Sequence, residues 1–149
     1  FDDFVDFRES LGFDVIPHTG GTTRPFARLK DTVQRGGAVA LLAERDLTRT
    51  GVPVTFFDEP ATMAAGPAQL AIETAAALHV VHLWYPDSDS WGTSVSPPLE
   101  VDTLERTTQR MADCFAANIA RHPADWHMLQ PLWTADVEER RRRRRSDGR

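Results

Sequence analysis

The chain has 149 residues, 41% of them apolar, which is enough for one core of ordinary domain size. Its formal net charge is −5, but residues 140–149 hold seven of the 17 basic and one of the 22 acidic residues. The rest therefore carries 10 basic against 21 acidic residues, a net charge of −11, which argues against nucleic acid as its partner. A single cysteine, Cys114, excludes an intrachain disulfide framework and fits a reducing compartment. No apolar run approaches the roughly 18 residues of a membrane-spanning helix.

The N-terminal part of the sequence alternates helix and strand signals. Residues 1–11 have the spacing of an amphipathic helix, and Gly12 lies where a C′ residue would end it. Because the chain opens inside this pattern and not at a Met, we expect it to be the C-terminal part of a longer protein. A strand is predicted over 13–18, and a helix from Thr22 or Thr23 to about Arg35, which two glycines end.

The remaining segments predict an α/β fold with a mostly parallel sheet flanked by helices, truncated at its N-terminal side. Residues 38–44 form a continuous apolar run of the kind that a parallel sheet buries on both faces. Strands that alternate with helices favour this architecture. The further predicted elements are a turn over 48–51, a strand over 52–57, a helix from Gly66-Pro67, a strand over 78–85, a loop over 86–98 and a long helix over 102–121.

The C-terminal segment is dominated by six consecutive arginines, Arg140 to Arg145. We predict that 1–135 is the C-terminal part of a single domain and 136–149 a charged, disordered tail. The arginines could lie on an anionic lipid surface or on RNA. Alternatively, they form a solvated, frayed helix end in which Glu138 and Glu139 pair with arginines four residues later.

An aromatic and aliphatic cluster precedes this tail. Next to basic residues, such a cluster suits a segment that dips into lipid headgroups. The packing of a terminal helix on the sheet explains it equally well. The cluster consists of Trp126, Met128, Leu129, Leu132 and Trp133.

The triplet Glu44-Arg45-Asp46 is the first candidate for a functional site. It follows an apolar run, and ligands of open α/β sheets bind at the carboxyl ends of the strands. A carboxylate there can orient a histidine and stabilise the imidazolium that forms when this histidine takes a proton. The alternative is a salt-bridged strand end without function.

Two segments carry a resemblance to a known family. Residues 38–71, AVALLAERDLTRTGVPVTFFDEPATMAAGPAQLA, resemble the central block of the bacterial lipid A biosynthesis acyltransferases. Residues 122–133, HPADWHMLQPLW, resemble the C-terminal signature of the phosphatidylinositol mannoside branch of that family in mycobacteria and other actinobacteria. The similarity extends over the chain to about Trp133 and implies a glycerolipid-acyltransferase-like fold.

The resemblance implies an acyltransferase of glycolipid biosynthesis that moves a fatty acyl group from acyl-CoA to a mannose hydroxyl. Such an enzyme acts as a peripheral protein at the cytoplasmic face of the plasma membrane, an anionic surface. Its general base is a histidine in a His-x4-Asp/Glu motif, assisted by a glutamate at the position of Glu44, the candidate catalytic residue. Arg8 matches a basic position near the site, although an exposed helix arginine is the alternative, and Arg45 and Asp46 are expected to bind substrate. No metal or cofactor is expected, since acyl-CoA is a co-substrate.

The histidine motif is absent from its expected place, which would precede Phe1. His82 and Asp87 have the right spacing, but they follow Glu44, which is the wrong order, so we do not assign them. The chain alone is therefore expected to be inactive. Two alternatives stay open: an acyltransferase of the lipid A type that acts on another glycolipid, and a non-catalytic domain that binds membrane surfaces.

Overall fold

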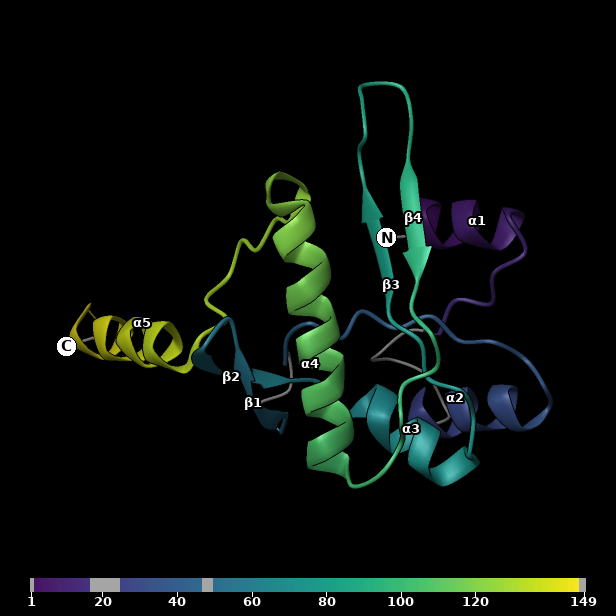
Figure 1. The fold of residues 1–149 in the computed structure, drawn as a ribbon, viewed down its shortest axis with the longest axis horizontal. Coiled ribbons are helices and arrows are strands. Elements are labelled where there is room, and N and C mark those ends of the chain that lie inside the picture. Colours follow the sequence, from purple (N-terminus) through teal and green to yellow (C-terminus); the bar gives the residue numbers. More distant parts are fainter. Residues whose placement is uncertain (1, 17–24, 47–49, 148–149) are drawn as a thin grey trace. The chain divides into compact units, whose positions relative to one another are not determined.

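The computed structural model describes residues 2–16, 25–46 and 50–147. The chain divides into two compact units, residues 1–40 and 41–149, which are described separately. The first unit contains helix α1 (Asp2–Ser10) and helix α2 (Pro25–Gln34), each close to its predicted position (Figure 1). Gly12 and Gly36 follow these helices with φ of +88° and +83°, the left-handed conformation that glycine adopts at little cost.

The sheets of the second unit are two antiparallel hairpins. Strand β1 (Val52–Phe56) pairs with β2 (Glu59–Met63) in a register that runs from Val52 opposite Met63 to Phe56 opposite Glu59. The two-residue connection, Phe57 and Asp58, has positive φ at both positions, as tight hairpin turns require. Strand β3 (Val81–Trp84) pairs in the same way with β4 (Gly92–Val95).

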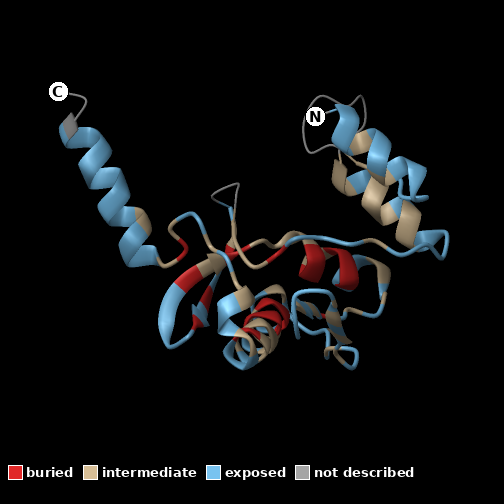
Figure 2. Ribbon diagram, turned by 90° about the horizontal axis from the view of Figure 1, so that it is seen from above, coloured by how far each residue is buried: buried red, intermediate tan, exposed pale blue. Residues whose placement is uncertain are grey.

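The second unit also contains helices, which contact these hairpins or one another. They are α3 (Gly66–Thr74), α4 (Leu104–Arg121), the short 3-10 helix η1 (Pro123–Asp125) and α5 (Thr134–Asp147). Helix α4 contacts β1, α3 and β3, and the buried residues gather around it (Figures 1 and 2). Its buried side chains include Met111 and Ala112, which belong to two apolar clusters, one formed with β1 and β2 and the other with α3.

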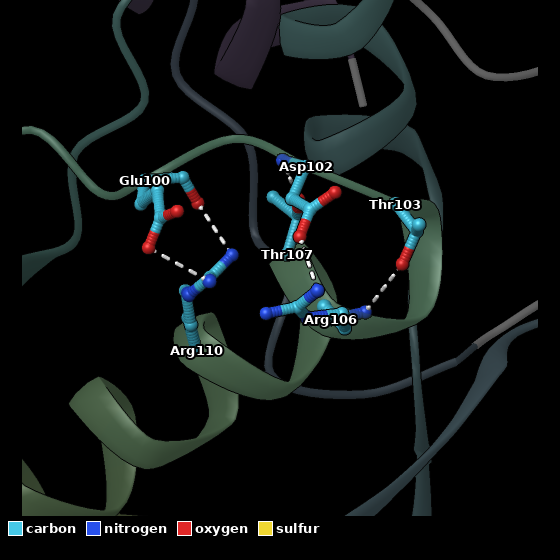
Figure 3. Close-up of polar contacts among 6 residues, drawn as sticks. All are labelled: Glu100, Asp102, Thr103, Arg106, Thr107 and Arg110. Carbon is cyan, nitrogen blue, oxygen red and sulfur yellow. Dashed lines mark hydrogen bonds and ion pairs between the residues drawn. The ribbon is translucent and has the colours of Figure 1, made fainter.

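The start of α4 is fixed by polar contacts, shown in Figure 3. The Thr103 hydroxyl accepts a hydrogen bond from the backbone N–H of Arg106 at 3.3 Å, which makes Thr103 the N-cap of the helix that was predicted over 102–121. Asp102 pairs with Arg106 at 2.8 Å, and its backbone N–H donates to the hydroxyl of Thr107. The loop before the helix is tied down by an ion pair of 2.8 Å between Glu100 and Arg110.

The parallel sheet predicted from the sequence is not seen. Residues 38–44 are extended but form no strand, and Leu42 is 94% exposed. A strand needs a hydrogen-bonding neighbour, and within the described part of the chain the strands pair only as the two hairpins. Residues 13–16 also form no strand, and the predicted turn from residue 48 lies partly outside the described residues. The fold is mixed α/β with small antiparallel sheets.

The C-terminal segment is helical as far as Asp147, where the sequence suggested either a disordered tail or a frayed helix end. Glu138 pairs with Arg142 at 3.6 Å, and Glu139 pairs with Arg143, the spacing of four residues that the second interpretation required. Arg140 to Arg145 are exposed, and Figure 2 shows most of this helix as exposed. The domain boundary at residue 135 stays a prediction.

The end of α3 leads to a stability prediction. Ala75 follows this helix with φ of 56°, a left-handed conformation that is strained for any residue with a Cβ. We expect Ala75→Gly to raise the free energy of unfolding by about 1 kcal/mol, because glycine removes this strain. Denaturant unfolding measures the change. Ala76→Gly is the matched control, since Ala76 has no positive φ, and it should not stabilise the chain.

Candidate functional site

The backbone at Glu44 is held by the residue before it. Ala43 is 3% exposed and packs against Ala68 of α3 and Met111 of α4. Residue 44 is therefore fixed at the edge of a buried cluster even though residues 38–44 form no strand. Glu44 is half-buried, and it forms no hydrogen bond or ion pair with another residue in the described ranges. Its backbone is thus positioned by the packing of Ala43, and its carboxylate has no partner among the described residues.

Asp46 fixes the other end of the triplet. Its Oδ2 accepts a hydrogen bond of 2.8 Å from the backbone N–H of Gly51, at the start of β1. The approach is so close that a Cβ on Gly51 would lie 2.6 Å from both the Asp46 Cβ and the Met63 carbonyl oxygen. The hydrogen bond between Asp46 and Gly51 therefore joins the triplet to the start of β1, and only a glycine at position 51 permits this close approach.

The four site residues predicted from the sequence are only partly gathered. Glu44, Arg45 and Asp46 are neighbours in one half-buried bend of the second unit. Arg8 belongs to α1, in the first unit, where its guanidinium carbon lies 3.4 Å from the centroid of the Phe4 ring. Such a cation–π contact is worth about 0.5–1 kcal/mol at an exposed site, and a role of Arg8 in substrate binding stays a prediction.

A stack of rings lies where β3 meets the end of α4, and no pattern in the sequence predicted it. His82 and Trp84, two residues apart on one face of β3, both stack on His122, with ring centroids 5.3 and 4.6 Å away. The Nε2 of His82 is buried without a hydrogen-bond partner in the structure as described. Burial lowers the pKa of His82, and the nearby His122 and Arg121 lower it further, while Asp125 offsets part of the effect. His82 is therefore a packed neutral ring.

This stack supports leaving His82 and Asp87 out of the site. His82 faces the rings of Trp84 and His122. Asp87 lies in the exposed loop beyond β3, where the backbone N–H of Asp89 donates to its carboxylate and lowers its pKa. The His-x4-Asp spacing of these two residues thus does not produce a paired acid and base.

The other candidate groups found from the sequence are structural. Burial raises the pKa of the Cys114 thiol, which makes it a poor nucleophile at neutral pH. No cluster of three or more His, Cys, Asp and Glu side chains that could hold a metal ion occurs in the described ranges. Most of the aromatic and aliphatic cluster packs as core, since Trp126, Met128, Leu132 and Trp133 join the β1–β2 cluster, whereas Leu129 is 93% exposed.

Comparison with known proteins decides the family. Residues 2–135 match the family model of the bacterial lipid A biosynthesis acyltransferases. The chain belongs to this family. It is 54% identical over 143 residues to the phosphatidylinositol mannoside acyltransferase of Mycolicibacterium smegmatis, a match that covers 95% of this chain and 47% of that protein. The protein of the same name from Mycobacterium tuberculosis is 53% identical over 141 residues, which are 93% of this chain and 44% of the relative.

These matches cover nearly all of this chain but only part of each relative. The chain spans about half the length of the curated relatives it matches. The match over most of this chain therefore shows its family but not the activity of the whole relative. None of the helices in the described ranges is both long enough and apolar enough to cross a bilayer.

The contact between Asp46 and Gly51 gives a second prediction. Gly51→Ala should lower the free energy of unfolding by about 1–3 kcal/mol, because the added methyl group forces the triplet or β2 to shift. Thermal or denaturant unfolding measures the loss. Gly66→Ala is the control, because a Cβ at the start of α3 would meet no atom within 4 Å. Equal stability of the two variants would contradict the contact.

The ring stack gives a pH prediction. The unfolded chain protonates His82 near pH 6.5, whereas the folded chain does so only at lower pH. Protons therefore favour the unfolded state. Titration of His82 does not lower the free energy of unfolding well above pH 6.5, but it does so as the pH drops below this value. In His82→Gln this fall should be smaller when unfolding midpoints are compared at about pH 7.5 and 5.5. The exposed His127 provides the control, since His127→Gln should retain the full pH dependence.

Proposed function

We propose that this chain forms part of an acyl-CoA-dependent O-acyltransferase that moves a fatty acyl group onto a mannose hydroxyl of a phosphatidylinositol mannoside. The observation that carries the proposal is the half-buried Glu44, held beside the buried Ala43, in a chain of this family that is 54% identical to an enzyme named for that reaction. A carboxylate on a backbone that is held by packing, with no partner among the described residues, is suited to accept a hydrogen bond from a ring N–H of a histidine.

In the proposed mechanism, a histidine of the family's His-x4-Asp/Glu motif, supplied outside this chain, takes the proton from the mannose hydroxyl. The hydroxyl oxygen attacks the thioester carbonyl carbon and forms a tetrahedral intermediate. The C–S bond then breaks, and the histidine returns the proton to the sulfur, so that CoA leaves as a thiol. Glu44 holds the imidazole and stabilises the imidazolium, and such general-base assistance contributes about 10²–10⁴ in rate.

The other proposed contacts follow from charge. Arg45 and Asp46 lie beside Glu44. We propose that they contact the phosphate or sugar groups of the two substrates, with Arg8 as a further candidate. We also propose that the exposed arginines of α5 hold the protein at an anionic membrane, on the cytoplasmic face of the plasma membrane. Each basic residue near such a surface is worth about 1 kcal/mol, and salt weakens the attraction.

The test of Glu44 uses a chimera in which this chain replaces the matched 143 residues of the Mycolicibacterium smegmatis relative. With palmitoyl-CoA and phosphatidylinositol mannoside, we expect Glu44→Gln to lower kcat/KM by about 10²-fold or more. The acid limb of the pH profile should also move to lower pH, because losing the carboxylate lowers the pKa of the histidine. Glu59→Gln, an exposed glutamate on β2, is the matched control and should leave both quantities unchanged.

The same assay separates the alternatives. Unchanged turnover in Glu44→Gln would remove this residue from the mechanism, provided that the unfolding midpoint is also unchanged. Acyl transfer to another glycolipid, but not to phosphatidylinositol mannoside, would favour an enzyme of the lipid A type. Binding to anionic vesicles without any thioester cleavage would favour the non-catalytic membrane-surface domain.

A further inference from the structure

The two carboxylates of the candidate triplet make different contacts. Glu44 has no partner among the described residues, whereas the Asp46 carboxylate binds the backbone of its own chain. Its Oδ2 accepts the backbone N–H of Gly51 at 2.8 Å, in a partly buried contact. A hydrogen bond to an ionised carboxylate is roughly twice as strong as one between neutral groups. This bond therefore joins the triplet firmly to the start of β1.

Gly51 is itself held against the β1–β2 hairpin. A Cβ at position 51 would lie 2.6 Å from the carbonyl oxygen of Met63 and 2.7 Å from the carboxylate carbon of Asp46. Met63 is fully buried and pairs with Val52 in the hairpin. The N–H that binds Asp46 thus belongs to a residue packed closely on the sheet. Through this N–H, Asp46 is tied to the core of the second unit.

The segment around Glu44 is consequently anchored on both sides. Ala43 is buried against α3 and α4, and Asp46 is bonded to the start of β1. Only two residues, Glu44 and Arg45, lie between these anchors, so few backbone conformations can connect them. Without the bond of Asp46, the same two residues would be held at one end only, and their backbone dihedrals would be free to vary.

We propose that Asp46 is a positioning residue: its hydrogen bond to Gly51 holds Glu44 where its carboxylate meets the histidine. The inference rests on the proposed function, because it assumes that Glu44 orients the histidine of an acyltransferase. It gives Asp46 a role besides substrate contact. A displacement of about 1 Å can lower the rate about 10²-fold, so loss of this bond should act on kcat. Loss of a contact made equally to substrate and transition state instead raises KM and leaves kcat unchanged.

The kinetic test uses the chimera with the Mycolicibacterium smegmatis relative. Asp46→Ala removes the acceptor and should lower kcat by about tenfold or more, with little change in KM. Asp46→Asn removes the charge but keeps an amide oxygen that accepts the Gly51 N–H, so it should recover most of the lost kcat. In the Glu44→Gln background, Asp46→Ala should have little further effect on kcat, because the residue that it positions no longer acts.

A variant on the other side of the hydrogen bond keeps the Asp46 carboxylate. Gly51→Ala forces the two residues apart, since the added methyl group would overlap the Asp46 side chain. It should also lower kcat, and this loss should be absent in the Glu44→Gln background. It decides the same question where Asp46→Ala does not fold. Gln109→Ala is the matched control, because it removes two hydrogen bonds of 2.9 Å to Thr55 on the same strand, and it should leave kcat unchanged.

Backbone order provides a measurement that needs no acyl transfer. In the isolated chain, the NMR order parameters of the Glu44 and Arg45 amides should fall in Asp46→Ala and be retained in Asp46→Asn. The Gly51 amide should lose its protection from hydrogen exchange in Asp46→Ala only. Gln109→Ala should leave the order parameters of the triplet unchanged.

Several results would overturn the inference. If Asp46→Ala and Asp46→Asn raise KM alike and leave kcat unchanged, Asp46 is a substrate contact only. A loss of kcat in Asp46→Ala that is equally large in the Glu44→Gln background, or that Gln109→Ala matches, also overturns it. Unaltered order parameters in Asp46→Ala do so without reference to activity. A chimera that transfers no acyl group, although the order parameters change as expected, would refute the proposed function alone.

Discussion

The second unit depends on the packing of one amphipathic helix, α4. Its buried face meets the β1–β2 hairpin, α3 and β3, so each of these elements covers part of its surface. The exposed edge of β1 is joined to it as well, because the Gln109 side chain accepts from the N–H of Thr55 and donates to its carbonyl, both at 2.9 Å. A side chain thus occupies an edge position that a neighbouring strand would otherwise fill. Two short hairpins, each marginal alone, become stable by packing on a common helix.

The position of the candidate site, Glu44 to Asp46, depends on this packing. Ala43 is buried against α3 and α4, and the next residue is Glu44, so the carboxylate sits where the cluster meets solvent. Asp46 closes the segment onto Gly51 at the start of β1. This segment, which has no strand pairing, is therefore held at two points, three residues apart. Glu44 lies between them, and its carboxylate has no partner among the described residues.

Signals within a few residues of sequence predicted the helix ends, whereas contacts between distant residues were not predicted. Thr103, Gly12 and Gly36 mark helix ends through interactions within a few residues, and the structure agrees. Strand β2 contains Pro60, and β4 is the short segment Gly-Thr-Ser-Val, so neither has the apolar pattern by which strands are recognised. The apolar patterns of the sequence indicate strands but not their partners, which is why a parallel sheet was expected and antiparallel hairpins were found. The charges of the triplet Glu44 to Asp46 were enough to predict it as a candidate site. The contact between the rings of His82 and His122 depends on the tertiary structure and could not be predicted in this way.

The overturned strand and the unpartnered hairpin face have the same physical origin. Residues 38–44 have the composition of a strand buried on both faces, yet Leu42 is almost fully exposed. The β3–β4 hairpin packs on the end of α4 with one face, whereas large apolar side chains of its other face, such as Leu83 and Trp91, are more than half exposed. Composition records the surroundings in which a segment is stable, and in both segments it specifies more apolar contact than the described residues provide.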